Sequence, residues 1–415
     1  MKNSNVSISA SVSEAYLARL AADSGAGVIT VPYNLPDAAA AAAYCRARGA
    51  KLIADFPDFV SDGELTVVLN RLIRAAKAGF AGAALNDLGL ITAAKELLPD
   101  FPIFAGSAFN VHNLFGAIEL KKLGVCCVSC SDILSDEELQ VIYDLGGLDV
   151  ETISDFEPRE ESSGTGSVYQ RRTVADSLDA RARAAALSRP KVKAVPRPKY
   201  RGGTYNPPEE KPFGHAGPPQ LTISLNSASQ LTSAVSRSGP KVLYIPYALI
   251  LENKQTLAGI WQNSEVCAIL PNTIRDSELP ALNRDLQELQ SLHVTSAALG
   301  NIGHIAIAKR FGFDIRASDG FNVCNTESIR RLADYGFKSC VLGRGTGGLS
   351  RDELRKLGKY IDTELVPPRG SRTADYPQSG LSALHLEFRR ESEKECLEAI
   401  NLAMFSPRAR RDAVS

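Results

Sequence analysis

Short apolar runs alternate along this chain with longer stretches in which apolar residues recur every three to four positions. In the first part, the apolar runs predict strands at residues 6–10, 28–31, 52–56, 82–85, 103–105, 125–130 and 149–153. Between them, residues 65–77, 91–98 and 114–122 have helical periodicity. Short strands that alternate with helices are typical of parallel βα units, so the pattern predicts an α/β fold.

The second part of the chain repeats this pattern. Its apolar runs predict strands at residues 221–225, 242–245, 266–270, 296–299, 314–317, 339–342 and 363–366. The tripeptide at 31–33 (VPY) recurs at 245–247 (IPY), and the pentapeptide at 109–113 (FNVHN) recurs at 321–325 (FNVCN). A nearly constant offset with small insertions indicates an internal duplication.

Each copy is short for a barrel. Seven units in roughly 150 residues give about 21 residues per unit, against about 31 in an ordinary (β/α)₈ barrel of about 250 residues. We therefore expect two tandem TIM-barrel-like domains, each compact or incomplete, and residues 383–388 as a candidate eighth strand of the second copy. The predicted divisions are a first repeat at 1–155, a linker at 156–219, a second repeat at 220–395 and a C-terminal tail at 396–415.

The linker is rich in proline and glycine, and one part of it is basic. Residues 171–201 contain ten Lys or Arg and two Asp, so this segment carries about +8 (10 − 2) in a chain whose 47 basic and 47 acidic residues cancel. A solvated, extended linker explains such a run, and a contact with RNA or an acidic partner is the alternative. Neutrality overall argues against a whole-molecule nucleic-acid binder.

The apolar runs and the cysteine count of the chain predict its cellular compartment. No apolar run reaches the roughly 18 residues that a membrane-spanning helix needs, and the N-terminus has no apolar signal core. Eight cysteines in 415 residues are too few for a disulfide-rich secreted scaffold. We expect a cytoplasmic protein with no membrane contact.

Several short motifs follow one another in a family-like order. Residues 86–90 (NDLGL), the FNVHN pentapeptide at 109–113 and residues 134–139 (LSDEEL) resemble the peptidase U32 family, also called collagenase-like. The second copy matches through 300–303 (GNIG), the FNVCN pentapeptide and 349–354. The resemblance covers most of 6–145 and 221–360, and both copies are more similar to the C-terminal, barrel-like half of the long family members.

This resemblance implies two classes of function. The family is classed with peptidases, and several relatives act in oxygen-independent hydroxylation of RNA or ubiquinone precursors through a four-cysteine iron–sulfur site. This sequence has no motif like the family's GxCxxPCR, so we predict no cofactor and no metal. The expectation is a U32 peptidase-like protein or a component of such hydroxylation. The alternative is a non-catalytic binding or scaffold module that partners a catalytic U32 subunit.

Polar residues follow the predicted strands where parallel barrels place their reactive groups, at the carboxyl ends. The amides there could bind a carbonyl or phosphate, and the carboxylates could act as general bases. Helix capping and ordinary loop positions are the alternative interpretation. The candidate binding amides are Asn86, Asn110, Asn113, Asn322 and Asn325, and the candidate carboxylates are Asp87 and Asp319.

Two further candidates depend on local context. His112 lies inside the repeated pentapeptide and could do acid–base work, but Cys324 replaces it in the second copy. His304 replaces Leu90 and is expected to be a surface or packing residue. Arg344 lies in the glycine-rich residues 343–348, which could cradle an anion or form a flexible loop.

Three cysteines cluster on one predicted strand. Strand alternation would place Cys126 and Cys130 on one face and Cys127 on the other, so one face offers two thiols and not four. We therefore expect small buried apolar side chains in place of a metal site.

Overall fold

The computed structural model of the chain describes residues 9–152, 197–207, 217–257, 264–343, 346 and 349–404. The first half is an open, parallel sheet of seven strands in sequence order. Its strands are β1 (Ser9–Ser11), β2 (Val28–Pro32), β3 (Lys51–Asp55), β4 (Gly82–Leu85), β5 (Ile103–Ala105), β6 (Val125–Cys130) and β7 (Asp149–Thr152). Its helices are α1 (Ala15–Asp23), α2 (Ala38–Ala47), α3 (Asp62–Ala78), α4 (Leu88–Leu97), η1 (Ser107–Phe109), α5 (Leu114–Lys122) and α6 (Asp136–Gly146).

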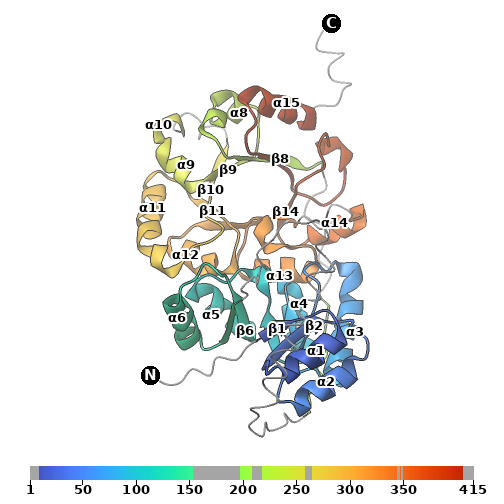
Figure 1. Ribbon diagram of the computed structural model, residues 1–415. Coiled ribbons are helices and arrows are strands. Elements are labelled where there is room, and N and C mark those ends of the chain that lie inside the picture. The colour runs from blue at the N-terminus through green and yellow to red at the C-terminus, as the bar shows by residue number, and fades with distance from the viewer. Residues whose placement is uncertain are drawn as a thin grey trace, which may run out of the picture.

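The second half is a closed parallel barrel in which β15 pairs with both β14 and β8 (Figure 1). Its strands are β8 (Gln220–Leu225), β9 (Val242–Pro246), β10 (Glu265–Ile269), β11 (Ser296–Leu299), β12 (Asp314–Ala317), β13 (Ser339–Val341), β14 (Asp362–Leu365) and β15 (Ala383–Phe388). Its α-helices are α8 (Ser233–Arg237), α9 (Tyr247–Glu252), α10 (Lys254–Leu257), α11 (Leu279–Ser291), α12 (Ile305–Arg310), α13 (Thr326–Asp334), α14 (Arg351–Leu357) and α15 (Glu393–Met404). Short 3₁₀ turns are η2 (Ala228–Gln230), η3 (Asp276–Glu278), η4 (Ile302–His304), η5 (Asp319–Phe321) and η7 (Thr373–Asp375).

The predicted fold class is confirmed. Both halves are parallel βα assemblies, the candidate eighth strand of the second copy is β15, and the first half is incomplete in the part of the chain that the structure describes. The helix α15 crosses residue 395, the boundary drawn from the sequence. Within the described residues, no helix is long and apolar enough to cross a bilayer.

Strand periodicity separates two cores in the second half. Leu221, Ile223 and Leu225 of β8 pack toward the helices, whereas Val242 and Tyr244 of β9 belong to a separate cluster inside the barrel. Since successive side chains of a strand point to opposite faces, the residues between the helix-facing ones line the barrel interior. Serine–glutamate capping boxes begin α3, α6 and α14, and those of α6 and α14 lie at equivalent points of the two halves.

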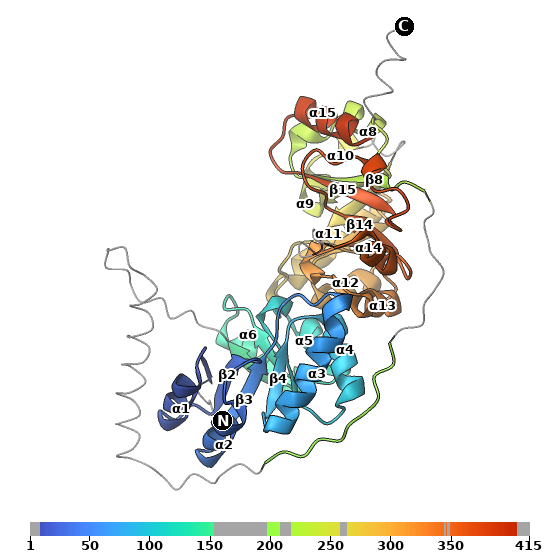
Figure 2. The same ribbon diagram turned by 90° about the vertical axis from the view of Figure 1, so that its right-hand side faces the viewer.

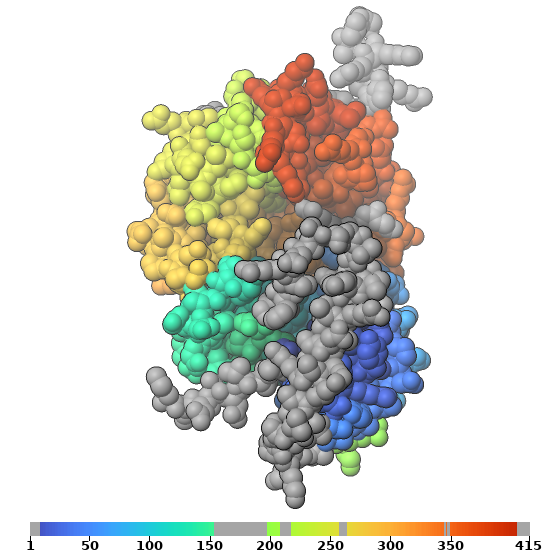
Figure 3. Space-filling model, in the orientation of Figure 1, coloured from blue at the N-terminus to red at the C-terminus, as the bar shows by residue number. Residues whose placement is uncertain are grey.

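The two halves adjoin directly. In the space-filling view, the teal part of the first half lies against the yellow and orange part of the second (Figure 3). The described segment 197–207 runs along the first half (Figure 2). There the Tyr200 hydroxyl donates to the Phe80 carbonyl at 3.0 Å, and the Tyr205 hydroxyl donates to Glu327 of α13 at 2.7 Å. This part of the basic segment is therefore docked on the protein, and residues 171–196 lie outside the described residues.

The alternation expected for the three cysteines is wrong at its first member. Cys126 is exposed, whereas Cys127 and Cys130 are buried. The register between β5 and β6 shifts after Ile103, which pairs with Val125 while the next residue pairs with Cys127. Cys126 is thus the extra residue of a β-bulge, and a bulge breaks the two-residue period.

Candidate functional site

The repeated motifs at the carboxyl ends of the strands lie between the two halves. Asn113 begins α5, and its side-chain Oδ1 accepts from Gly116 N at 2.9 Å. Its Nδ2 donates across the boundary to the Ile274 carbonyl at 2.8 Å. Asn325 does the same for the other half, because its Oδ1 accepts from Ser328 N and its Nδ2 donates to the Val60 carbonyl at 2.8 Å.

A second pair of contacts is also reciprocal. Asp62 Oδ1 accepts from Thr326 N at 2.8 Å, and Asp276 Oδ2 accepts from Leu114 N at 2.9 Å. Asp62 and Asp276 occupy equivalent positions of the repeat, as do Leu114 and Thr326. The interface is therefore approximately two-fold, and in each half the carboxylate at the first residue of α3 or η3 accepts from the first residue of a helix of the other half.

Glycines allow the helices to approach closely at this interface. A Cβ atom added to Gly89 would lie 2.4 Å from Ser328 N and 2.5 Å from Asn325 Oδ1, and one added to Gly303 would lie 2.5 Å from Asn113 Oδ1. Gly89 and Gly303 are equivalent in the repeat. The glycine that recurs in the family-like motif is thus required by close packing, and no side chain fits in its place.

Asp87 lies inside this interface, where it caps α4. Its Oδ1 accepts from Leu90 N at 2.7 Å, and its Oδ2 accepts from Asn325 Nδ2 at 2.8 Å. Burial raises the pKa of Asp87 to about 6, against the opposing effect of the hydrogen bonds it receives. The capping interpretation holds for Asp87, Asn113 and Asn325, and general-base action by Asp87 stays a prediction.

His112 lies against His304 of the other half. Its Nδ1 lies 2.6 Å from the Asn110 carbonyl oxygen, and its Nε2 lies 3.0 Å from Nε2 of His304. A carbonyl only accepts, so Nδ1 of His112 carries a proton and the bond between the two rings holds a single proton donated by His304. His304 is fully buried, so it is a packing residue and not a surface residue.

Two of the remaining candidate residues, Asn86 and Asn322, line a small cavity at the interface. Asn86, Asn301 and Asn322 are among the side chains that line about 20 Å³, too little for any ligand larger than a water. Asn110 and Asn322 both have positive φ, 41° and 51°, which marks them as equivalent turn positions. Asn301 Nδ2 donates to the Asn110 carbonyl at 3.1 Å. Asn301 thus bonds across the interface, whereas Asn86 Oδ1 accepts from Ala108 N of its own half at 3.2 Å.

Asp319 and Arg344 are placed differently. Asp319 begins η5, partly exposed, in the turn where Asn322 N donates to the Asp319 carbonyl at 2.9 Å. Arg344 lies outside the described residues, so its predicted anion contact stays a prediction. The described residues contain no group of three or more His, Cys, Asp or Glu suited to a metal ion.

A polar cluster that the sequence analysis missed lies inside the closed barrel. Glu364 of β14 is buried and accepts from the Thr222 hydroxyl at 2.7 Å, the Tyr244 hydroxyl at 2.6 Å and the Ser339 hydroxyl at 2.8 Å. His385 Nδ1 lies 3.0 Å from the Thr222 Oγ1 atom and 3.5 Å from a Glu364 carboxylate oxygen. The sequence pattern that could have indicated this cluster is the alternation of polar and apolar residues in β8 and β15. Only closure of the barrel brings these two strands side by side.

Electrostatics keep this glutamate ionised. Burial by itself would raise the pKa of Glu364, but hydrogen bonds and charge from His385 and the hydroxyls of Thr222 and Tyr244 outweigh it and lower the pKa to about 2. Burial, together with the charge of the same carboxylate, raises the pKa of Tyr244, which therefore remains a donor. His385 Nε2 lies 2.8 Å from Ser224 Oγ.

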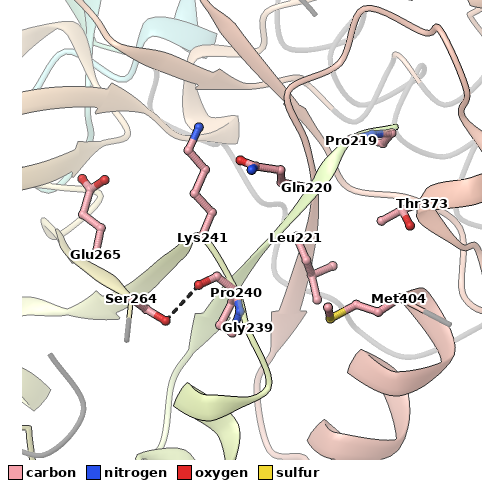
Figure 4. Close-up of a pocket in the computed structure, with 10 residues that line it drawn as sticks. All are labelled: Pro219, Gln220, Leu221, Gly239, Pro240, Lys241, Ser264, Glu265, Thr373 and Met404. Carbon is pink, nitrogen blue, oxygen red and sulfur yellow. Dashed lines mark hydrogen bonds between the residues drawn. The ribbon is translucent and has the colours of Figure 1, made fainter. Parts of the chain in front are cut away.

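The amino-terminal mouth of the same barrel is hollow. A cavity of about 700 Å³ is lined by the starts of β8, β9 and β10 and by α15. Figure 4 shows the polar side chains of Lys241, Gln220 and Glu265 on one side of it, with Met404 beside Leu221 on the other. Lys241 pairs with Asp362 at 3.4 Å. In parallel barrels this end serves stability, whereas the carboxyl end carries chemistry.

Comparisons with known proteins identify a family. The model described as peptidase family U32 matches residues 33–153 and 258–365, one segment in each half. No curated protein matches the chain. Among solved structures, a Coccidioides immitis protein assigned as a fructose-1,6-biphosphate aldolase matches at 9% identity and TM-score 0.31 over 45% of this chain and 88% of its own. An L-Ala-D/L-Glu epimerase matches at 13% identity and TM-score 0.27, over 42% of this chain and 58% of its own.

Proposed function

This chain belongs to the peptidase U32 family, and we propose that it serves there as a binding module whose repeated family motif joins the open first half to the closed barrel of the second half. One observation carries the proposal. The amide groups of Asn113 and Asn325, which the repeat retains, each cap a helix of their own half and donate to a carbonyl of the other half. Because both Oδ1 and Nδ2 of each amide are occupied by hydrogen bonds within the protein, these groups stabilise the arrangement of the two halves and do not face a substrate.

The partner we propose is a catalytic U32 subunit that carries the four-cysteine site. Within the described residues, β1 pairs only with β2 and β7 only with β6. The edge strands of an open sheet present main-chain N–H and C=O groups that a partner strand can pair with. The closed second barrel offers no such edges, so the open first half is the proposed docking side.

A binding titration tests this proposal. Full-length chain mixed with a purified U32 protein that holds the iron–sulfur cluster should form a complex at micromolar concentrations, measured by light scattering. Absence of a complex contradicts the proposed partner. If Asn113→Ala or Asn325→Ala abolished an enzymatic activity while leaving the unfolding free energy unchanged, the motif would be catalytic. The interpretation that these amides hold the two halves together would then be wrong.

Contact with RNA through residues 171–201 is a separate proposal, supported by the charge of about +8 in that segment. Deleting 171–196 leaves the docked residues Tyr200 and Tyr205 in place. RNA affinity should fall in the deletion variant and should depend strongly on salt. Unchanged affinity contradicts a contact at this segment.

Hydrolysis, the activity in the family's name, is the second candidate function. The observation that favours it is the serine, histidine and glutamate set inside the closed barrel, at a distance from the repeated motif.

A further inference from the structure

We propose that Ser224, His385 and Glu364 form an acyl-transfer site at the carboxyl-end mouth of the closed barrel, with ester or amide substrates. The inference rests on the second candidate function and is independent of the binding proposal. It concerns the interior of the second barrel, which shares no residue with the interface between the halves.

Hydrogen bonding fixes the roles of the three groups. Thr222 gives its single hydroxyl proton to Glu364, so it can only accept from His385 Nδ1 at 3.0 Å. Nδ1 therefore carries a proton, so in the ring form that acts as a base the lone pair is on Nε2, which faces Ser224 Oγ at 2.8 Å. A nucleophile, a base and a group that orients the base are thus aligned, in the order that nucleophilic catalysis requires.

The glutamate acts as a positioning residue. Its carboxylate lies 3.5 Å from His385 Nδ1 and is bridged to it by the Thr222 hydroxyl. Three hydroxyl groups hold it in place, among them those of Tyr244 and Ser339. A fixed negative charge beside Nδ1 stabilises the imidazolium that forms when His385 takes a proton.

Strand register places Ser224 in the outermost inward-facing layer of the barrel. It lies two residues after Thr222 on β8, and it pairs in register with Glu387 of β15. The Glu387 side chain is 28% exposed, and Asn226, which follows the end of β8, is exposed. Ser224 itself is buried but is 7% exposed, against 4% for His385 and 2% for Glu364, so the serine is the member of the set nearest to solvent.

The reaction that this arrangement supports is hydrolysis of an ester or amide, with water as the second reactant. Ser224 Oγ forms a bond to the acyl carbon while its proton passes to His385 Nε2. The imidazolium returns that proton to the departing alcohol or amine as the C–O or C–N bond breaks, which leaves an acyl ester on Ser224. Water then attacks this ester by the same route and releases a carboxylic acid.

A fluorophosphonate probe tests the proposal on the full-length chain. We expect one phosphonyl adduct, located by mass spectrometry on the peptide that contains Ser224. Mapping the adduct on the unmodified protein needs no variant that might fail to fold. An unlabelled Ser224, or an adduct on the neighbouring exposed Ser229 alone, overturns the proposal.

Variants separate catalysis from reactivity of an isolated serine. The labelling rate should fall at least tenfold in His385→Gln, and the pH profile of labelling should shift in Glu364→Gln. Ser229→Ala, an exposed serine on η2, is the matched control and should label as the unmodified chain does. Equal labelling rates for His385→Gln and the unmodified chain overturn the assigned base. Complex formation with a U32 subunit is measured separately, so failure of either proposal leaves the other standing.

Discussion

His112 and His304, from opposite halves of the chain, face each other with their Nε2 atoms 3.0 Å apart in a buried interface. The equivalent position on the other side of the approximate two-fold axis holds Cys324 and Leu90. One side of the interface between the halves therefore contains two imidazoles joined by a single hydrogen bond. The other side contains no histidine at the equivalent positions.

This asymmetry predicts pH-dependent stability. Burial lowers the pKa of both imidazoles, that of His304 to about 3. A group whose folded pKa is lowered contributes its full stability above the unfolded pKa of about 6.5 and loses it as pH falls toward the folded value, at about 1.4 kcal/mol per pH unit and proton. Asp87, whose pKa is raised to about 6, takes up a proton in the folded state and opposes this loss.

The chain supplies its own control for that experiment. His112→Cys with His304→Leu copies the opposite side of the interface and keeps Asp87. Urea unfolding at pH 7.5 and pH 5 should show a smaller stability loss for the double variant than for the unmodified chain. An equal loss in both proteins would assign the pH dependence to other groups.

Gly89→Ala should be strongly destabilising. The added Cβ would overlap the backbone of α13 and the Asn325 side chain, so the two halves must separate. We expect a loss of about 2–4 kcal/mol, in the range of overpacked cores. Gly63→Ala in α3 is the matched control, because its Cβ would meet only ordinary contacts and alanine favours a helix by about 1 kcal/mol. Thermal unfolding of both variants distinguishes them.

Asn113→Ala and Asn325→Ala should each cost about 2–3 kcal/mol, because each removes a helix cap and leaves a buried carbonyl without its donor. The loss should be larger for Asn325→Ala, because Asn325 Nδ2 also donates to the buried Asp87 carboxylate at 2.8 Å, in addition to the reciprocal contacts. Ser350→Ala removes only a cap from the exposed start of α14 and should cost about 1 kcal/mol. Equal losses for all three variants in urea unfolding would contradict a role across the interface.

In the part of the chain that the structure describes, two ion pairs join the halves, Arg275 with Glu138 and the longer pair of Arg330 with Glu96 at 3.5 Å. Arg275 Nη2 donates to Glu138 at 2.6 Å, and the hydrogen bonds and charge of Arg275 lower the pKa of Glu138 to about 2. That contribution is complete above the ordinary pKa of 4.5 and is lost as pH falls toward 2. Arg275→Ser copies Ser61 of the other half. We expect a chemical shift titration of Glu138 to move to higher pH in this variant, and an unmoved titration would contradict the assigned cause.

Much of this architecture could be predicted from sequence, because it depends on local periodicity. The runs at 82–85, 103–105, 125–130 and 383–388 match the strands residue for residue. Candidate site residues could be placed at strand ends, but their partners could not be predicted. His112 and His304 are 192 residues apart, and their contact depends on how two finished halves dock.

The sequence by itself determined the duplicated βα pattern, the family and the loop positions of its motif, since each follows from short-range spacing of apolar, glycine and amide residues. Only the tertiary structure decided what those residues do. Docking of the halves turned Asn113 and Asn325 into reciprocal donors to carbonyls of the opposite half. Barrel closure through β15 placed His385 between Ser224 and Glu364. Both outcomes depend on rigid-body geometry, because groups distant in sequence meet only when whole elements have packed.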